Sequence, residues 1–532
     1  MRIRVKAGAG RDVALMALEI RIVSNTGAYG NHAGETLYHA CSESFSVYRC
    51  PNKKIDAYAV YTNLAPAGAI RGYGLTQSVF AVESAMDELA RVLELDPIEF
   101  RRRNAVRPGD PMISMSDKPE DAEYGSYGLD QCLDLVQDAL ARGNGVAAPE
   151  GEDWLVGQGI ALGMHDTAPP TEHRSEARLS VGADGNYHLA VGTAEFGNGT
   201  TTLHAQVVAS LLETITSRVR TVQSDTDRTG YDTGAFASTG TIVAGNAVRL
   251  ATEALRERIL DFASAHSGAS RDASRLDDGA VRCNGSRIPL AELLVAAQAA
   301  GQQLEVVRKA HGAPRSVAFN VQGFRIAVHR VTGVVINPMQ CRAQIEGSVA
   351  QGLGWALYER MVFDEEGRVV NPTFRKYRIP AFADVPRTEV SFADTQDALG
   401  PLGAKGMGEC PINPVSPTLA NALADATGVR FRDLPFTADR IYRRIFEHHA
   451  VDNWTSSSLG GSDLANASGA GRRYPGHDGR WAPRTLQWRA VRPRWDNRAG
   501  RPHRAASAGR RRRAGHDGPD RAARLREHPP PP

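Results

Sequence analysis

The stretch IDAYAVYTNLAPAGAIRGYGLTQSVF, residues 55–80, decides the fold of the chain. Its first residues are rich in aromatic and β-branched side chains and predict a strand, and a loop with Pro66 and Gly68 follows. From Val79 to Leu93, apolar side chains recur at helical spacing. A strand that passes through a glycine-rich loop into a helix is typical of mixed sheet-and-helix proteins.

Three further glycine-rich segments lie between a predicted strand and a predicted helix: residues 195–201, 234–240 and 405–410. Glycine permits a positive φ and lets a ligand approach the backbone, and the helix that follows offers N–H groups to anions. For any one segment alone, a tight turn or a helix cap is the favoured interpretation. None has the spacing of a Walker loop or of a dinucleotide-binding fingerprint.

Elsewhere the pattern predicts strands that alternate with helices. Strands are expected at 18–23, 176–181 and 187–191, and helices at 97–100, 201–212, 246–262, 344–359 and 416–428. We therefore predict an α+β (mixed α/β) fold of two related units of sheets packed with helices, at residues 1–150 and 151–446. Residues 447–532 are expected to form a disordered tail rich in Arg, Pro and Gly.

Composition argues against several classes of protein. No apolar run approaches the roughly 18 residues of a membrane span, and the first residues lack the apolar core of a secretion signal. Six cysteines are scattered without a CxxC pair. This spacing argues against a disulfide framework, a zinc ribbon and a self-contained iron–sulfur cluster, and it favours a reducing cytoplasm.

Charge is distributed unevenly along the chain. Residues 451–532 contain 17 Arg, no Lys and 7 acidic residues, whereas the remainder is mildly acidic. A basic arm that binds nucleic acid is one interpretation of this segment. The segment has no helical period, and its mixture of Trp and Arg is typical of a gene translated in the wrong reading frame. We therefore assign it no function and expect no nucleic-acid or membrane partner.

In their order along the chain, the glycine-rich segments resemble the molybdopterin-binding large subunit of the xanthine oxidase family of molybdenum hydroxylases. The resemblance runs from Ala14 through Phe446. Its motifs are RGYG (71–74), DPIEFRRRN (96–104), AEFGNGTTT (194–202), AFASTG (235–240), GNAV (245–248), INPMQCRAQIEG (336–347), QGLGWALYE (351–359) and AKGMGEC (404–410). It implies that residues 1–150 are the remainder of a first molybdopterin-binding domain and that residues 151–446 form a second.

The resemblance implies a molybdenum-dependent oxidoreductase that hydroxylates a carbon atom of a small-molecule substrate with oxygen from water. Its molybdenum is held by the dithiolene of molybdopterin, in the plain or the cytosine dinucleotide form, so no metal-ligating side chains are expected. Because the cysteines provide no cluster site, electrons would pass to an iron–sulfur small subunit and an FAD-binding medium subunit.

Positions in the family motifs imply the site residues. Glu409 is expected to be the catalytic base, with a pKa raised by burial. Arg71 is expected to stabilise negative charge on the substrate, and Tyr73 to stack against a planar substrate. Contacts to the pterin and its phosphate are expected from Phe196, Gly197, Asn198, Gly199, Ala235, Ala237, Ser238, Gln344, Gly406 and Gly408.

Other interpretations of these side chains stay open. Glu409 could cap a helix, and Arg71 could form a salt bridge at the surface. Tyr73 could be an ordinary core aromatic, and Gln344 could face solvent.

The same positions bear on the substrate. Gly72 stands where carbon monoxide dehydrogenases carry a copper-binding cysteine, which argues against that branch. Arg71 with Tyr73 favours a purine or another N-heteroaromatic substrate, and an aldehyde oxidoreductase is the alternative. His165 and His204 are interpreted as packing or hydrogen-bonding residues, since lone histidines seldom bind metals.

Three places differ from the family pattern. The chain starts after the family's Gly-Gly-x-Phe-Gly loop, a strand and turn are missing between Gly333 and Val334, and the resemblance stops near Phe446. Two hypotheses follow. The chain is a catalytic subunit completed by a separate N-terminal half, or it is a truncated remnant without redox activity.

Overall fold

The structure is a computed structural model that describes residues 1–110, 122–143, 154–167, 173–312, 315–329 and 342–445, with the single residues 145 and 447. The chain divides into two units, Met1–Ser458 and Leu459–Pro532. The predicted tail lies outside the described residues apart from residue 447, and so does the shortened segment at 331–341. The domain boundaries near residues 150 and 446 stay predictions.

A three-stranded sheet opens the chain, in the order β1 (Arg2–Ala9), β2 (Leu15–Gly27), β3 (Asn52–Tyr61). β1 and β2 are antiparallel, whereas β2 and β3 are parallel. Parallel neighbours need a crossover, and α1 (Ala33–Ser46) supplies it, a helix that the sequence analysis did not predict. Both predicted strands in this region are confirmed.

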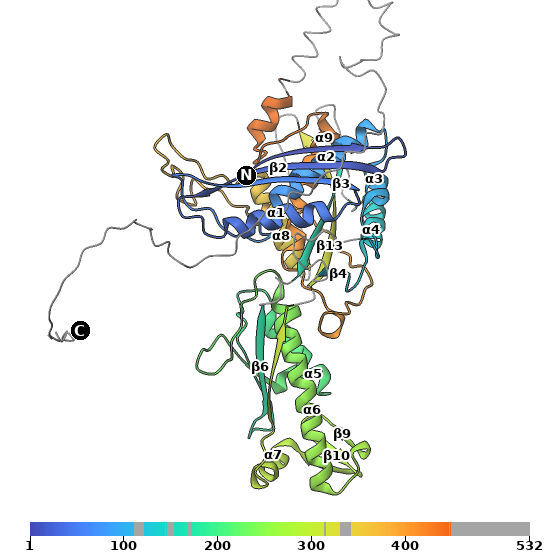
Figure 1. Cartoon of the computed structure of the whole chain (residues 1–532), viewed down its shortest axis with the longest axis vertical. Helices are drawn as coiled ribbons and strands as arrows, with labels where there is room; N and C mark the ends of the chain where they lie inside the picture. The colour runs from blue at the N-terminus through green and yellow to red at the C-terminus, as the bar shows by residue number, and fades with distance from the viewer. Residues whose placement is uncertain are drawn as a thin grey trace, which may run out of the picture. The chain divides into compact units, whose positions relative to one another are not determined.

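Helices cover one face of this sheet (Figure 1). α2 (Leu75–Val92) follows the RGYG loop as predicted and packs against α1 and β1. Asp96 caps α3 (Pro97–Asn104), because its Oδ1 accepts hydrogen bonds from the N–H groups of Ile98 and Glu99 at 2.8 and 2.9 Å. α4 (Leu129–Arg142) lies beyond α3.

A second sheet has the order β4 (Ala122–Glu123), β13 (Arg315–His329), β5 (Trp154–Thr167), with β5 and β13 antiparallel. α9 (Val415–Thr427) packs on β5 at bare backbone: a Cβ added at Gly159 would lie 2.2 Å from the backbone N of Ala422. α8 (Arg342–Leu357) packs on α9 at a glycine as well. The Cβ missing at Gly352 would lie 2.6 Å from Val415, which confirms the close packing expected of this glycine-rich helix.

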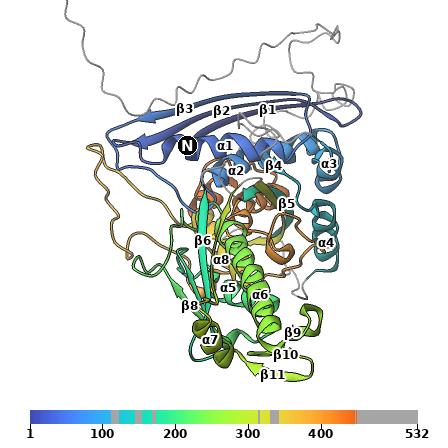
Figure 2. The same cartoon turned by 60° about the horizontal axis from the view of Figure 1, so that its bottom comes forward.

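The third sheet follows the order β12 (Glu305–His311), β6 (Arg174–Val181), β7 (Tyr187–Val191), β8 (Val219–Gln223). β6 and β7 form the predicted hairpin. α5 (Thr200–Leu211) and the long α6 (Gly245–Ser267) pack beside the sheet (Figure 2). Their apolar side chains form one core with it, which includes Leu179, Val207 and Leu255.

Smaller elements complete the described residues. They are the sheet β11 (Ser286–Pro289), β10 (Ala280–Cys283), β9 (Ser274–Leu276); α7 (Leu290–Ala299); and the short helical turns η2 (Thr216–Arg218), η3 (Gly240–Ala244), η4 (Arg271–Ala273), η5 (Phe382–Asp384), η6 (Pro401–Gly403) and η7 (Cys410–Ile412). The predicted α+β fold is confirmed.

A buried ion pair connects the helices of the first part of the chain to β5. Arg101 Nε lies 2.9 Å from Glu83 Oε2, and both side chains are almost fully buried. The same carboxylate accepts hydrogen bonds from Tyr48 and from the N–H of Leu162 in β5. Because all these donors are satisfied together, the buried charge fixes α2 and α3 against the strand.

Two expectations from composition have structural counterparts. Among the described residues, no helix has the length and apolar character to cross a bilayer. The described cysteines, Cys41, Cys50, Cys132, Cys283 and Cys410, are all free thiols.

The glycine contact between β5 and α9 predicts a specific sensitivity. Gly159→Ala should lower the free energy of unfolding by about 1–3 kcal/mol, because its Cβ meets the main chain of α9 and one element must shift. Gly8→Ala in β1 is the matched control: its Cβ meets nothing within 4 Å, so the change should be at most about 0.5 kcal/mol. Urea unfolding followed by circular dichroism measures both, and equal effects would contradict the packing described here.

Candidate active site

Glu409 lies where several of the predicted segments meet. Its Oε1 accepts a hydrogen bond from the N–H of Gly72 at 3.2 Å, and its Oε2 accepts one from Ser238 Oγ at 3.3 Å. His165 Nε2, near the end of β5, lies 3.3 Å from the same Oε2. The side chain is 15% exposed. Glu409 stands at the N-cap position of η7, but its side chain makes no capping hydrogen bond, so the structure does not support the helix-cap interpretation.

The RGYG loop reaches Glu409 because of its glycines. Gly72 has a φ of +84°, and a Cβ there would lie 2.5 Å from Asn413 Oδ1 and 2.9 Å from Ile412. Any larger residue would therefore push the loop away from the segment that carries Glu409. Gly74 has a φ of +93° and stands directly before α2.

Arg71 holds two other segments in place. Its Nε donates to the carbonyl of Gly408 at 2.5 Å, and its Nη2 donates to Gln344 Oε1 at 2.9 Å. The amide of Gln344 in turn donates from Nε2 to the carbonyl of Gly197 at 3.1 Å. Arg71 and Gln344 thus connect the RGYG, KGMGE and EFGNG segments. Among the described residues Arg71 forms no surface salt bridge, and Gln344 bonds other segments instead of only facing solvent.

The 234–240 segment presents Ser238 through a strained turn. Ala237 and Ser238 have φ values of +53° and +57°. Residues other than glycine seldom adopt a positive φ, and those that do are often found at functional sites. Gly406 allows the turn to approach, since its Cβ would lie 2.3 Å from the carbonyl of Ser238. Ala235 stands just before the turn.

The backbone N–H groups of the EFGNG segment already hold a carboxylate. Glu195 Oε1 accepts hydrogen bonds from Gly197 and Gly199 at 2.7 and 3.1 Å, and Oε2 accepts one from Thr201 at 3.1 Å. These bonds lower the pKa of Glu195 against the opposing effect of burial. Within the segment, Phe196 is 70% exposed.

Asn198 Nδ2 donates to the carbonyl of Ala194 at 3.2 Å, and its Oδ1 accepts from Thr200. The side chain of Asn198 therefore closes the loop that carries Gly197.

Tyr73 lies beside the site on the α1 side. Its hydroxyl is 2.7 Å from His32 Nδ1, and its ring meets that of His39 edge-on at 5.2 Å. Burial and nearby carboxylates raise the pKa of Tyr73 to about 12, so the phenol is neutral at physiological pH.

The pKa of Glu409 is opposite to the expectation. Burial acts to raise it, but the interactions with His165 and with the Gly72 N–H outweigh burial and lower it. The predicted upward shift is therefore wrong, because it counted burial without these partners. The carboxylate is ionised at neutral pH and able to accept a proton.

Two residues of the site escaped the sequence analysis. His165 is interpreted from the sequence as a packing or hydrogen-bonding residue, and no local pattern links it to Glu409, 244 positions further on. Glu195 belongs to the quoted motif, and an acid just before two glycines was an available signal. His204 fits its interpretation, because it is buried and lies 3.1 Å from the carbonyl of Gly240.

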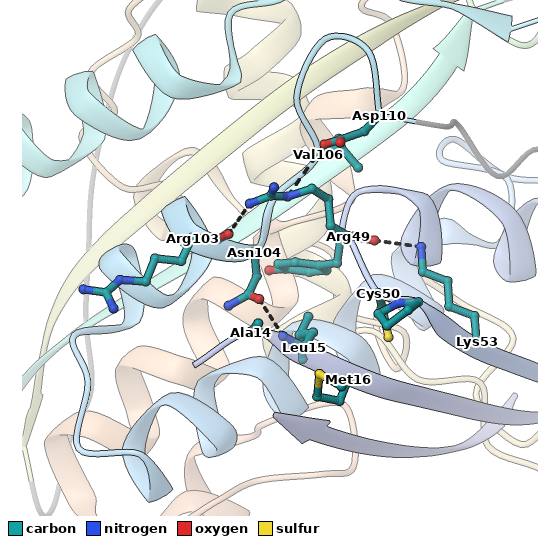
Figure 3. A pocket seen from close by; sticks show the side chains of 12 residues that line it. Ala14, Leu15, Met16, Arg49, Cys50, Lys53, Arg103, Asn104, Val106 and Asp110 are labelled. Atoms are coloured by element: carbon teal, nitrogen blue, oxygen red, sulfur yellow. Dashed lines mark hydrogen bonds and ion pairs between the residues drawn. The ribbon is translucent and has the colours of Figure 1, made fainter. Parts of the chain in front are cut away.

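A cavity of about 420 Å³ lies between β2, the end of α1 and α3 (Figure 3). Its lining includes none of the predicted site residues. Lys53 donates to the carbonyls of Phe45 and Tyr48, and Arg49 donates to that of Ala105. Because these cations bond main-chain carbonyls, the cavity is a weaker candidate for a ligand site than the surroundings of Glu409.

Models of a molybdopterin cofactor-binding domain match residues 1–105 and residues 137–386 of the chain. Together they span more than half of it. The chain belongs to the molybdenum hydroxylase family. The resemblance found from the glycine-rich segments is thereby confirmed, and the family is that of molybdopterin-dependent oxidoreductases of the xanthine dehydrogenase and aldehyde oxidoreductase type.

Relatives of this molybdenum hydroxylase chain are known in bacteria. The xanthine dehydrogenase molybdenum-binding subunit of Escherichia coli O157:H7 is 32% identical over 475 residues, 82% of this chain and 61% of that subunit. The aldehyde oxidoreductase molybdenum-binding subunit PaoC of the same organism is 29% identical over 454 residues, 80% of this chain and 59% of PaoC.

The crystal structure of quinoline 2-oxidoreductase from Pseudomonas putida 86 is similar with a TM-score of 0.72 and 26% identity, covering 84% of this chain and 62% of that chain. The chain thus spans about three fifths of the length of each of these three relatives.

The hydrogen bonds of Glu195 predict its contribution to stability. Glu195→Ala leaves the N–H groups of Gly197, Gly199 and Thr201 without their acceptor and should lower the free energy of unfolding by about 0.5–2 kcal/mol. Glu195→Gln keeps an acceptor and should lose less. Glu365→Ala is the control, because Glu365 is exposed and bonds nothing among the described residues. Equal unfolding midpoints for Glu195→Ala and Glu365→Ala would contradict this role.

Proposed function

We propose that this chain is the catalytic part of a molybdenum hydroxylase that converts R–H and water to R–OH, two electrons and two protons. The observation that carries the proposal is the ionised, mostly buried Glu409 carboxylate, held by Gly72 and Ser238 within segments that the family shares. A carboxylate so placed can accept a proton as the substrate carbon gains oxygen.

The donors around Glu409 fit an anionic cofactor that carries its own metal ligands. Ser238 Oγ bonds the Glu409 carboxylate. Arg71 and Gln344 bond each other and the carbonyls of Gly408 and Gly197, and they bring a positive charge and an amide to the same segments. We propose that these side chains hold molybdopterin, with backbone contacts from Gly197, from the 235–237 turn, and from Gly406 and Gly408. When bound, the molybdenum centre supplies the two-electron oxidation.

The EFGNG loop can bind the cofactor only if the Glu195 side chain moves. Its N–H groups at Gly197 and Gly199 bond the carboxylate of Glu195. Contact between these groups and a cofactor phosphate requires that carboxylate to move aside. The cofactor would then contact Phe196, Asn198 and Ala235 on the surfaces of the loops that carry them.

The chain's own residues have distinct tasks in the reaction. Glu409 accepts a proton. Arg71 keeps its positive charge at all relevant pH values and stabilises negative charge that develops on the substrate. Tyr73, next to the same loop, offers a ring against a planar substrate.

Electrons must leave through other proteins. The described cysteines are dispersed free thiols, so we propose an iron–sulfur small subunit and an FAD-binding medium subunit as partners. We further propose the cytosine dinucleotide form of the cofactor as one option, and a cytoplasmic location.

We propose a purine or another N-heteroaromatic compound as the substrate. The names of two relatives, a xanthine dehydrogenase subunit and quinoline 2-oxidoreductase, support this class, and so do Arg71 and Tyr73. The relative PaoC supports an aldehyde as the second candidate.

Replacing the base tests the function directly. In the holoenzyme, Glu409→Gln keeps the size of the side chain but removes its basicity, so kcat should fall by about 10²–10⁴-fold. Molybdenum content, measured by elemental analysis, should stay unchanged. Glu365→Gln, on an exposed loop, should leave both unchanged. Full activity in Glu409→Gln would discard the base, and a wild-type holoenzyme without molybdenum would discard the proposed function.

The substrate class is tested by comparing kcat/KM for xanthine, quinoline and benzaldehyde. We expect an N-heterocycle to be preferred. Arg71→Met should lower kcat/KM for that heterocycle by about 10²–10³-fold and lower it less for benzaldehyde, because only the heterocycle develops ring charge. An equal loss for both substrates would assign Arg71 to holding Gly408 and Gln344 alone.

A further inference from the structure

A second polar cluster lies directly behind Glu409. His39 and Glu43 are one turn apart on α1, and His165 and Asp166 are adjacent near the end of β5. All four residues are buried, with exposures of 9%, 2%, 1% and 5%.

Donor atoms of this cluster lie close together. His39 Nδ1 lies 2.8 Å from Glu43 Oε1 and 3.9 Å from Asp166 Oδ1, and His165 Nδ1 lies 3.8 Å from Glu43 Oε1. One donor atom from each of His39, Glu43 and Asp166 lies within 4.8 Å of the others.

Some buried atoms of the cluster have no hydrogen-bond partner among the described residues, and two of them face its interior. They are Glu43 Oε2 and His165 Nδ1, and both belong to side chains that are more than nine-tenths buried. An unpaired buried carboxylate oxygen or imidazole nitrogen is costly, since nothing replaces its lost hydration. The cluster therefore has unused ligand capacity pointing inward.

We propose that His39, Glu43, His165 and Asp166 bind a divalent d-block cation of the zinc type, separate from the molybdenum cofactor. Two imidazole nitrogens and two carboxylate oxygens are a donor set that Zn²⁺ accepts in four-coordinate sites. Tetrahedral Zn²⁺ places neighbouring donors about 3.3 Å apart. Three of the donor separations in the cluster, at 2.8, 3.9 and 3.8 Å, lie on both sides of that value.

Charge supports a dication at this place. Against the effect of burial, the carboxylates around them raise the pKa of His39 to about 9 and also raise that of His165, so protonated imidazoles balance the carboxylates when no metal is bound. A dication would replace that positive charge. Beyond His165 lies the further carboxylate of Glu409, and no lysine or arginine is paired with Glu43 among the described residues. Four protein ligands and full burial are typical of a structural site that has no open position for substrate.

The cation would act on Glu409 through His165. The two ring nitrogens of His165 face opposite sides, Nδ1 toward Glu43 and Nε2 toward Glu409 at 3.3 Å. A metal on Nδ1 fixes the tautomer with hydrogen on Nε2, which then donates to the Glu409 carboxylate. This is the carboxylate–histidine–metal arrangement of many zinc sites. His165 is a positioning residue in this scheme.

The test is a titration of the untagged full chain, freed of metals with a chelator, by isothermal calorimetry with Zn²⁺. We expect one Zn²⁺ per chain. Glu43→Gln, which keeps size and loses charge, should weaken the Kd by about 100-fold or more, because losing even an outer-shell partner costs 10–100-fold. Co²⁺ at the same site should give four-coordinate d–d absorption that Glu43→Gln lacks. Molybdenum and substrate are not needed, so the result is independent of the proposed function.

The matched control is the exposed pair of His188 and Asp184, whose Nε2 and Oδ1 lie 3.2 Å apart. His188→Gln should bind Zn²⁺ like the wild type. If Glu43→Gln does not fold, Asp166→Asn takes its place, and Zn²⁺ should raise the Tm of the wild type but not of this variant. A wild-type chain that binds no Zn²⁺, or variants that bind it equally well, would overturn the proposal and leave the cluster a hydrogen-bonded network.

Discussion

The contact between β5 and α9 sets the position of the candidate base. At Gly157 and Gly159 the strand has no side chain to separate it from the helix, so the two backbones touch. The segment that leads into α9 must therefore pass the inner end of β5, where Cys410 lies against Gly163. Glu409 consequently faces His165 as a result of backbone packing, before any specific attraction between the two side chains contributes.

The charge of Glu409 depends on the groups that surround it. Burial alone acts to raise the pKa of Glu409, and the side chain of His165 in β5 and the N–H of Gly72 in the RGYG loop lower it. Arg71 and Gln344 hold the RGYG, KGMGE and EFGNG segments together with bonds to backbone carbonyls. No single motif makes the site. It exists only in the folded chain, which explains why the motifs resemble ordinary turns when taken singly.

The sequence predicts local elements well and long-range pairs poorly. The alternation in β2 and the spacing in α2 are properties of neighbouring residues, and both elements were correctly predicted. α1 was missed because polar residues such as Ser42 and Glu43 are buried in it, which hides its apolar face.

For the site, the motifs indicated Glu409 and the segments around it. The direction of its pKa depended on His165 and could not be read from either segment, because their contact forms only in three dimensions. The same holds for the cluster behind it, where two residues of α1 meet two of β5.

The bonds of Glu195 have a consequence for how this loop can bind anything. The Glu195 carboxylate occupies the N–H groups of its own loop, so any anion from solution must compete with it for them. Because Glu195 is covalently part of the loop, its effective concentration there is fixed by the short chain that links it and does not depend on the solution. Weak anions such as chloride or buffer carboxylates will lose that competition, whereas a multivalent phosphate held also by neighbouring segments can win it. The Glu195 carboxylate thus makes the loop selective: it excludes anions that bind only there and admits an anion that other segments also bind.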